Sequence, residues 1–522
     1  MKSIINLFKQ PMSMVQYILF MTLLNMILFH VPLYTYALEN LEIVSVNGFL
    51  IFLMVLISLF VVSTLLFVIF ALISTRLLKY FTVLMMFLNP IALYFMLTYN
   101  VILDRTMMGN LFNTNSSEAF SFYHPKIFFY LFLGLLVAYF VAKIKIKKST
   151  RISLLKYGIS IVLMGILILY LNANKWLWLD KHAKKLGAMS MPWSYLINSV
   201  RYKVRALKAT QKMILLPDAT FKNEKDNTVV ILVIGESARA KNFSLYGYEK
   251  ETNPKLKKHE VIALKNTLSA TTYTTASVHS ILSHTGSTSD AHEPLPSYLQ
   301  RQGVAVTWRT NNWGEPALKV GTYERKSDLE PSCVGEECEH DGGLLTGLEE
   351  RIKSFDANRS LYVLHTTGSH GPSYYEKYPK SFEHFNPICR TVDLKQCTQE
   401  ELMNAYDNTI LYTDHFLANI IEILKRQKNR NTLLIYISDH GESLGEYGLY
   451  LHGTPYSIAP DVQKQIPFLL WASPRFRENK KMEDLNFSLK KEYGQYNIFH
   501  SIMGAFEMNA TVYDKELDIF SK

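Results

Sequence analysis

Five long apolar runs in the first third of the chain constrain its fold more than any other feature. Each is long enough to cross about 30 Å of hydrocarbon as a helix, since a helix rises about 1.5 Å per residue. The remaining residues have mixed charges with glycine and proline turns. The sequence therefore predicts an α-helical membrane domain followed by a water-exposed domain. The predicted spans cover residues 14–35, 48–74, 78–100, 127–143 and 153–172.

The charges that flank these runs predict the direction in which they cross. Lys2 and Lys9 precede the first run, and a dense basic cluster over residues 143–151 follows the fourth. The loop after the first run has Glu39 and Glu42 but no lysine or arginine. Because short cytoplasmic loops are rich in Lys and Arg, we expect the N-terminus in the cytoplasm. Five crossings then place the chain after about residue 173 on the outer side.

The formal net charge of +10 does not indicate nucleic-acid binding, because of where the basic residues lie. They gather at the ends of the apolar runs and over residues 181–212, where they suit anionic lipid headgroups. Tryptophans near this stretch favour the membrane interface. We predict a transmembrane domain over 1–173, interfacial helices and a linker over 174–226, and a soluble domain over 227–522.

All four cysteines lie in the predicted soluble domain, as two closely spaced pairs. Cys333 lies near Cys338, and Cys389 lies near Cys397. Neither pair has the Cys-x-x-Cys spacing of zinc and redox motifs. Two short-loop disulfides in an oxidising compartment are the simpler interpretation, and buried free thiols are the alternative. Disulfides require this domain to lie outside the cytoplasm, as the charge distribution also predicts.

In the soluble domain, β-branched apolar runs alternate with helical patterns, which predicts an α/β fold with a largely parallel sheet. Polar residues follow four of the predicted strands: Glu236 after 228–234, Asn312 after 304–308, His365 to His370 after 361–364, and Asp439 with His440 after 433–437. Open α/β sheets place their sites at the carboxyl edge of the strands. These side chains are therefore expected to converge there.

Such a convergence predicts a metal site, although any one of these residues alone would be taken for a turn residue or a helix cap. Glu236, Asp439 and His440 form a mixed nitrogen and oxygen ligand set, which suits zinc. Calcium and magnesium prefer oxygen ligands alone. A zinc ion with an open position lowers the pKa of a bound oxygen and stabilises phosphoryl charge.

A hydroxyl-rich segment, from Thr271 to Ser277, opens a predicted helix and supplies candidate nucleophiles. Backbone N–H groups and the positive end of the helix dipole favour an anion at such a position. Threonine is a poor nucleophile unless a metal or base activates it. Without the metal ligands, a helix-capping cluster would be the better interpretation.

These motifs together resemble the inner-membrane phosphoethanolamine transferases of Gram-negative bacteria, a family that includes mobile colistin-resistance enzymes. The resemblance covers nearly the whole chain and implies an alkaline phosphatase/sulfatase-like α/β domain in the periplasm. The motifs are Gly235-Glu236-Ser237-Ala238-Arg239, Tyr246-Gly247-Tyr248, Trp308 to Asn312, Leu364 to Pro372, Ala405 to Asn408, Ser438 to Glu442 and His452-Gly453-Thr454-Pro455.

The resemblance also implies roles for individual residues. Zinc, as one ion or two, is expected on Glu236, Thr274, Asp439 and His440, with Thr274 as the nucleophile. Ser277 and Val278 follow Thr274 at the family's spacing, and Thr275 is the second candidate. Substrate-binding roles are expected for Asn110, Thr114, Glu118, Asn312, His370 and His452. On sequence alone, the loop over residues 101–126 would be taken for a solvated loop.

The implied reaction moves phosphoethanolamine from phosphatidylethanolamine to lipid A, lipooligosaccharide or another envelope glycan. It would pass through a zinc-bound phosphothreonine-type intermediate in two displacements, and modified lipid A would confer polymyxin resistance. A membrane-embedded monomer is expected. The alternative is a phosphoglycerol transferase of the lipoteichoic acid synthase type. A sulfatase is disfavoured because its Cys/Ser-x-Pro-x-Arg signature is absent. A binding module with a degenerate site would lack zinc ligands that are present here.

Overall fold

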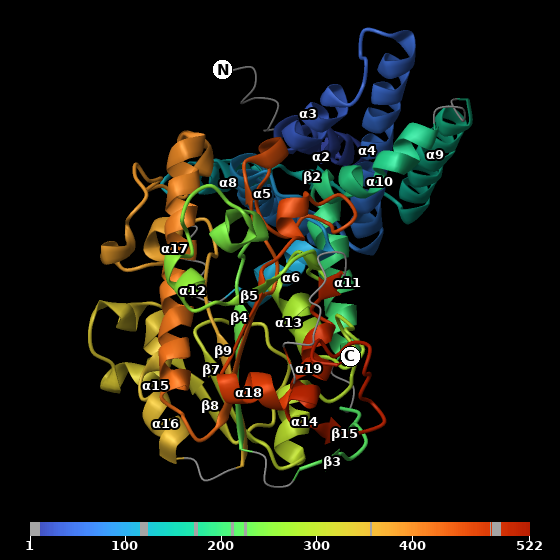
Figure 1. Ribbon diagram of the computed structural model, residues 1–522. Helices are drawn as coiled ribbons and strands as arrows, with labels where there is room; N and C mark the ends of the chain where they lie inside the picture. The colour runs from blue at the N-terminus through green and yellow to red at the C-terminus, as the bar shows by residue number, and fades with distance from the viewer. Residues whose placement is uncertain are drawn as a thin grey trace. The chain divides into compact units, whose positions relative to one another are not determined.

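The computed structural model describes residues 11–114, 124–171, 176–209, 213–223, 227–354, 358–480, 482 and 492–521 (Figure 1). The chain divides into two compact units. The described residues of the first lie within Met1–Met108 and Tyr123–Tyr202, and those of the second lie within Gly109–Phe122 and Lys203–Lys522.

The first unit is helical. Its helices are α2 (Met14–Phe29), α3 (Val31–Glu39), α4 (Val46–Ile73), α5 (Thr75–Tyr99), α8 (Lys126–Lys143), α9 (Arg151–Leu171) and α10 (Trp176–Met189). Two more, α6 (Arg105–Asn113) and α11 (Trp193–Ala209), contain residues of both units. Within the part of the chain that the structure describes, α4, α5, α8 and most of α9 are each long and apolar enough to cross a membrane.

The first predicted span is not one continuous helix. It is a pair, α2 and α3, bent by 63° at His30. Pro32 lies in the first turn of α3, where its missing N–H costs nothing, and it cannot continue the hydrogen-bond ladder of α2. Counting the bent pair as one span gives up to five crossings.

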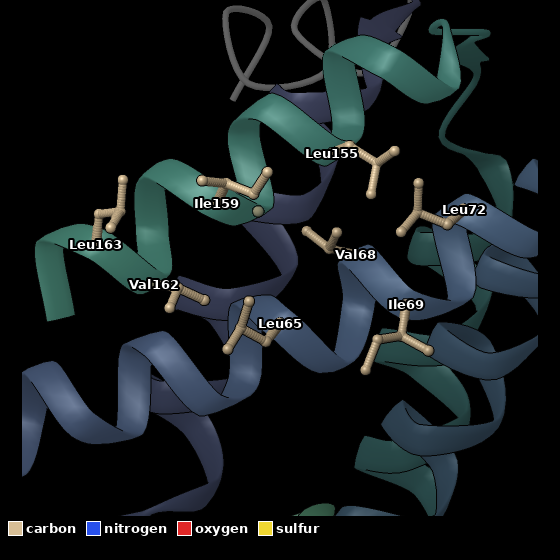
Figure 2. Close-up of a pocket in the computed structure, with 9 residues that line it drawn as sticks. Leu65, Val68, Ile69, Leu72, Leu155, Ile159, Val162 and Leu163 are labelled. Carbon is tan, nitrogen blue, oxygen red and sulfur yellow. The ribbon is translucent and has the colours of Figure 1, made fainter. Parts of the chain in front are cut away.

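Many apolar side chains of this unit face outward, as expected for a protein in lipid. Phe128, Phe132 and Leu163 are more than half exposed. A groove between α4 and α9 is lined by leucine, isoleucine and valine side chains with one glycine (Figure 2). Hydrocarbon is the solvent that such a surface suits, because a soluble protein would hide these side chains in its core.

Inside the unit, a small polar network joins helices that are far apart in the sequence. Asn89 donates to Asn25 Oδ1 at 2.7 Å, and Tyr195 donates to Asn89 Oδ1 at 2.9 Å. Asn25 in turn donates to the Met191 carbonyl at 2.8 Å. Amides within an apolar bundle need such partners, so the network fixes how α2, α5 and α11 pack.

The second unit contains a seven-stranded sheet in the order β5-β13-β10-β4-β9-β7-β8. The strands are β4 (Thr228–Gly235), β5 (Ile262–Leu264), β7 (Ala305–Thr310), β8 (Thr322–Arg325), β9 (Arg359–His365), β10 (Asn431–Ser438) and β13 (Phe468–Ala472). The five strands from β10 to β8 are parallel, as the sequence predicts. Strands β13 and β5, which the apolar pattern did not predict, lie at one edge of the sheet, where β13 pairs antiparallel with both β10 and β5.

Helices cover both faces of this sheet (Figure 1). One face packs against α13 (Thr274–Leu282), α14 (Leu295–Arg301), α18 (Pro474–Asn479) and α19 (Asn497–Ala505), and this layer forms the main core of the second unit. The other face carries α12 (Pro254–Lys258), α16 (Leu348–Ser354) and α17 (Gln399–Lys425). Every residue of β4, β9 and β10 is buried, as a parallel sheet covered on both faces requires.

Two features near α17 confirm the sequence interpretation. The helix begins at Gln399, because Thr398 and Glu401 form a reciprocal capping box, and it supplies one of the helical segments expected between strands. Disulfides join Cys333 to Cys338 and Cys389 to Cys397, and the structure has no free cysteine among its described residues. The free-thiol alternative is therefore wrong.

Replacing Asn89 with Leu should destabilise the first unit by about 1–3 kcal/mol, because Asn25 and Tyr195 would each lose a buried partner. We expect a lower apparent unfolding temperature in detergent. Ser160→Leu, on an exposed face of α9, is the matched control and should leave it unchanged. Equal unfolding temperatures for the two variants would contradict the proposed importance of the network.

Candidate active site

The register of the parallel strands brings four strand ends to one edge of the sheet. Gly235 pairs with Ser438, Ile234 pairs with His365, and Thr310 also pairs with His365. The residues that follow these positions therefore emerge side by side. The four polar strand ends of the sequence prediction, on β4, β7, β9 and β10, are those found here.

Two buried carboxylates and one imidazole occupy the centre of this edge. His440 Nε2 lies 3.3 Å from Glu236 Oε1 and 3.3 Å from Asp439 Oδ2. All three side chains are at most 1% exposed. Asp439 Oδ1 accepts from the backbone N–H groups of Ser237 and His440, at 3.0 and 2.6 Å. Asp439 Oδ2 has no hydrogen-bond partner among the described residues.

The proximity of these groups shifts their pKa values. Burial, with the negative charge of Glu236, raises the pKa of Asp439 well above its usual range. Burial and the neighbouring His452 lower the pKa of His440 to about 3, so its imidazole is neutral. Burial opposes ionisation of Glu236, but the histidines, His440 foremost, hold its pKa below the ordinary value. Two adjacent buried carboxylates ionise together only beside a positive charge.

The residues present fit a divalent metal ion. Asp439 Oδ2 is a buried acceptor without a donor, and a neutral imidazole is the form that binds metal. Glu236, His440 and His452 also offer ligand atoms that all lie within 4.8 Å of one another. A cation at this position would remove the repulsion between the two carboxylates. We therefore regard this edge of the sheet as a candidate metal centre.

Thr274 begins α13 and directs its hydroxyl at the same centre. Its Oγ1 donates to Glu236 Oε2 at 3.1 Å and lies 3.5 Å from His440 Nε2. The methyl group of Thr275 instead faces Gly314, 3.1 Å from the place that a Cβ on that glycine would occupy. Thr271 and Ser277 hydrogen bond to each other at 2.8 Å, so some hydroxyls of the segment serve to hold the helix start.

Three further predicted residues surround the metal centre. Asn312 donates to Glu236 Oε2 at 3.0 Å and to the Thr366 carbonyl at 2.9 Å. The rings of His370 and His452 lie 5.1 Å apart, and those of His440 and His452 lie 4.3 Å apart. The structure thus brings Asn312, His370 and His452 to the same edge as the candidate ligands.

The predicted headgroup loop is placed only in part. Asn110 belongs to the second unit, and its Nδ2 lies 3.2 Å from the position of a Cβ on Gly453, next to His452. Thr114 donates to the Asn110 carbonyl at 2.8 Å, a contact at the end of α6. Glu118 lies outside the described residues. Of the two described residues, Asn110 is the one that the structure brings toward His452.

Several supporting residues of this site were not predicted from the sequence. Ser237, at φ 56°, donates to Glu236 Oε1 at 2.8 Å, and its place directly after Glu236 was the available signal. Glu442 Oε2 lies 3.4 Å from His452 Nδ1. Asp341 accepts from the N–H groups of Thr367 and Gly368, at 2.9 and 2.8 Å, and so fixes the loop before His370. Nothing in the sequence around Asp341 indicated this role.

Comparison with known proteins identifies the family. A model described as phosphoethanolamine transferase EptA/EptB matches residues 59–207, and a sulfatase model matches residues 228–508. Phosphoethanolamine transferase EptA of Helicobacter pylori is 38% identical over 98% of this chain and 97% of its own length. The chain belongs to the phosphoethanolamine transferase EptA family.

One solved structure agrees with this chain over the whole fold. The integral membrane protein lipooligosaccharide phosphoethanolamine transferase A of Neisseria meningitidis superposes with a TM-score of 0.88 at 26% identity, over 97% of this chain and 98% of that chain. Phosphatidylethanolamine transferase Mcr-1 of Escherichia coli is 30% identical over 76% of this chain and 78% of its own length. The protein is thus a membrane-embedded phosphoethanolamine transferase, and the phosphoglycerol transferase alternative is not supported.

Removing either buried carboxylate of the transferase should weaken metal binding, because each offers a ligand oxygen and offsets the ion's charge. We expect Glu236→Gln and Asp439→Asn to hold less divalent metal per chain than the wild-type transferase. Inductively coupled plasma mass spectrometry of the purified proteins measures this content. Asp414→Asn is the control, since Asp414 is also buried but caps the start of α12. Full metal content in both site variants would contradict the assignment.

Proposed function

We propose that this transferase moves phosphoethanolamine from phosphatidylethanolamine to lipid A or lipooligosaccharide at the periplasmic face of the bacterial inner membrane. The observation that most supports this function is the position of the Thr274 hydroxyl, which lies 3.1 Å from the buried Glu236 carboxylate in the candidate metal centre. Two relatives support the donor and the acceptor: one is a phosphatidylethanolamine transferase, and the other is a lipooligosaccharide phosphoethanolamine transferase.

Glu236, Thr274, Asp439 and His440 are the residues that would hold zinc. When bound, zinc supplies positive charge that lowers the pKa of a hydroxyl ligand and stabilises phosphoryl oxygens. The mixed carboxylate and imidazole set favours zinc over calcium or magnesium. His370 and His452, beside this set, are candidates either for phosphate binding or for a second zinc ion.

The reaction would proceed in two displacements. Thr274 Oγ1 attacks phosphorus, a bond between this oxygen and phosphorus forms, and the bond from phosphorus to the diacylglycerol oxygen breaks. The hydroxyl proton ends on the diacylglycerol. An oxygen of the acceptor, from a lipid A phosphate for example, then attacks the same phosphorus, and the bond from phosphorus to Thr274 Oγ1 breaks. The proton of the attacking acceptor group ends on Thr274 Oγ1. Glu236 Oε2 orients the hydroxyl for the first step by accepting its hydrogen bond.

The positions of Asn312 and Asn110 suggest a role for each of them in substrate binding. Asn312 donates to Glu236 Oε2, the oxygen that also accepts from Thr274, so it would hold this carboxylate in place beside the proposed nucleophile. Asn110, next to Gly453, is proposed to contact the ethanolamine headgroup together with Thr114 and Glu118. The donor is a membrane lipid, which explains why a phosphoryl transferase of this kind needs a membrane part.

The proposed location rests on charge and on cysteine chemistry. Five crossings, with α2 and α3 counted as one bent span, would carry the second unit from a cytoplasmic N-terminus to the periplasm. Both disulfides fit an oxidising compartment. The domain boundaries of 1–173, 174–226 and 227–522, and the monomeric state, stay predictions.

Thr274→Ala should reduce transfer at least about 1,000-fold, because it removes the hydroxyl that lies near both Glu236 Oε2 and His440 Nε2. Mass spectrometry of lipid A from expressing cells is the measurement, with polymyxin susceptibility as a second readout. Thr275→Ala should retain transfer, since its side chain faces Gly314. Wild-type product from Thr274→Ala, with loss in Thr275→Ala, would move the nucleophile to Thr275.

Asn110→Ala should lower kcat/KM for phosphatidylethanolamine about 10-fold or more, the loss expected when a hydrogen bond to a polar headgroup is removed. Metal content should not change, because Asn110 is not a ligand. Asn40→Ala is the control, since that amide lies at an exposed helix end and donates to the Tyr36 carbonyl. An unchanged kcat/KM would exclude Asn110 from donor binding.

A further inference from the structure

A second group of metal-ligating side chains follows the helix that Thr274 begins. His284, Asp290 and His292 lie in the segment between α13 and α14. Each offers one ligand atom, and these atoms all lie within 4.8 Å of one another. None of the three belongs to the candidate active site described above. The aspartate follows the first histidine by six residues, and the second histidine follows the aspartate by two. This spacing is compact enough for one loop to enclose an ion.

Two ring nitrogens of this group make no hydrogen bond within the part of the chain that the structure describes. His284 Nδ1 and His292 Nδ1 are both buried, and neither has a hydrogen-bond partner among the described residues. Their rings lie 4.7 Å apart. Buried polar atoms are rarely left unpaired, so two such nitrogens side by side point to a ligand that both can bind.

The aspartate is already oriented for the same ligand. Asp290 Oδ2 accepts hydrogen bonds from Ser283 Oγ at 2.7 Å and Thr285 Oγ1 at 3.0 Å. Asp290 Oδ1 lies 3.8 Å from His292 Nδ1, too far for a hydrogen bond. A metal ion bonded to both atoms at about 2.0–2.2 Å spans such a separation. Hydroxyl groups that hold a ligating carboxylate are typical of metal sites.

Two nearby histidines are occupied elsewhere. His279 approaches the carbonyl oxygens of Ser287 and Asp290, at 2.9 and 3.1 Å. His500 approaches the His284 carbonyl at 2.8 Å and accepts from the Asp514 N–H. The ligand set is therefore two imidazoles and one carboxylate. The His292 side chain is 34% exposed, so water can reach a fourth position.

We propose that His284, Asp290 and His292 bind one zinc ion, separate from the candidate active site. Two nitrogen ligands and one oxygen ligand with a water suit tetrahedral zinc, whereas calcium and magnesium prefer oxygen alone. The proposal does not depend on the zinc chemistry proposed for Thr274, because it uses other residues.

The position of this site indicates a bracing role. The segment that contains it follows α13, whose first residue is Thr274. The same segment pairs with Ile214, through Ile214 N–H to the Ala291 carbonyl at 2.8 Å and Glu293 N–H to the Ile214 carbonyl at 2.9 Å. The cysteines pair elsewhere, so no disulfide closes this segment. An ion here would tie the end of the nucleophile helix to the strand-like segment at Ile214.

The test measures zinc per chain in the full-length transferase, purified in detergent, equilibrated with zinc alone and then desalted. His292→Ala and Asp290→Asn should each hold about one zinc ion fewer per chain than their parent. The same difference should appear in the Glu236→Gln background, so the number of ions at the active site does not affect the result. His259→Ala, a histidine near Lys425, is the matched control and should keep the parent's content.

Cobalt gives an independent readout that does not involve activity. Titration of the Glu236→Gln transferase with Co²⁺ should produce visible absorption bands that His292→Ala lacks. Circular dichroism checks that each variant folds. If His292→Ala is unfolded, the milder variant Asp290→Asn decides whether this site binds the ion. Equal zinc content in the parent and a folded Asp290→Asn chain, with unchanged cobalt spectra, would overturn the proposal whether or not the transferase reaction is confirmed.

Discussion

Glu236 and Asp439 lie at the ends of neighbouring parallel strands, and the register of β4 with β10 keeps these two carboxylates together. Both are buried, and a buried pair of like charges is costly unless a cation or a proton lies between them. Every residue of β4 and β10 is buried, so these two strands are rigid and hold the carboxylates close together despite their repulsion. The candidate metal centre is therefore a consequence of the sheet.

A layer of backbone contacts around the carboxylates prevents them from moving apart. Tyr406 on α17 donates to the Ser237 carbonyl at 2.7 Å, and Arg239 N–H donates back to Tyr406 at 3.0 Å. On the other side, Gly368 approaches so closely that a Cβ there would lie 2.7 Å from the Glu236 carbonyl. A helix and a glycine loop thus hold the turn that carries Glu236, which explains why Tyr406 and Gly368 stand within recognisable motifs.

The sequence predicted the features that local patterns determine. Strand ends followed by Glu236 or by Asp439 are visible because buried strands have apolar, β-branched residues up to their last position. Asp341 was not predictable, since its partners Thr367 and Gly368 are distant in the chain and its surroundings have no period. The break at His30 was missed for another reason: composition alone gives a continuous apolar run, and Pro32 is compatible with either a kink or a new helix start.

The structure of the segment after α13 was also not predictable from the sequence. This segment is rich in hydroxyl and histidine side chains, has no apolar periodicity, and is held by hydrogen bonds between side chains. Ser283 and Thr285 both point at Asp290, which closes the segment into a small loop beside the sheet's main core. The loop lies between α13, which begins with the proposed nucleophile Thr274, and the pairing at Ile214, so its rigidity would affect how well that hydroxyl is positioned. A reaction that depends on attack by one hydroxyl loses rate steeply with misplacement of that hydroxyl. Selection on catalysis would therefore act on this loop as well as on the ligands themselves.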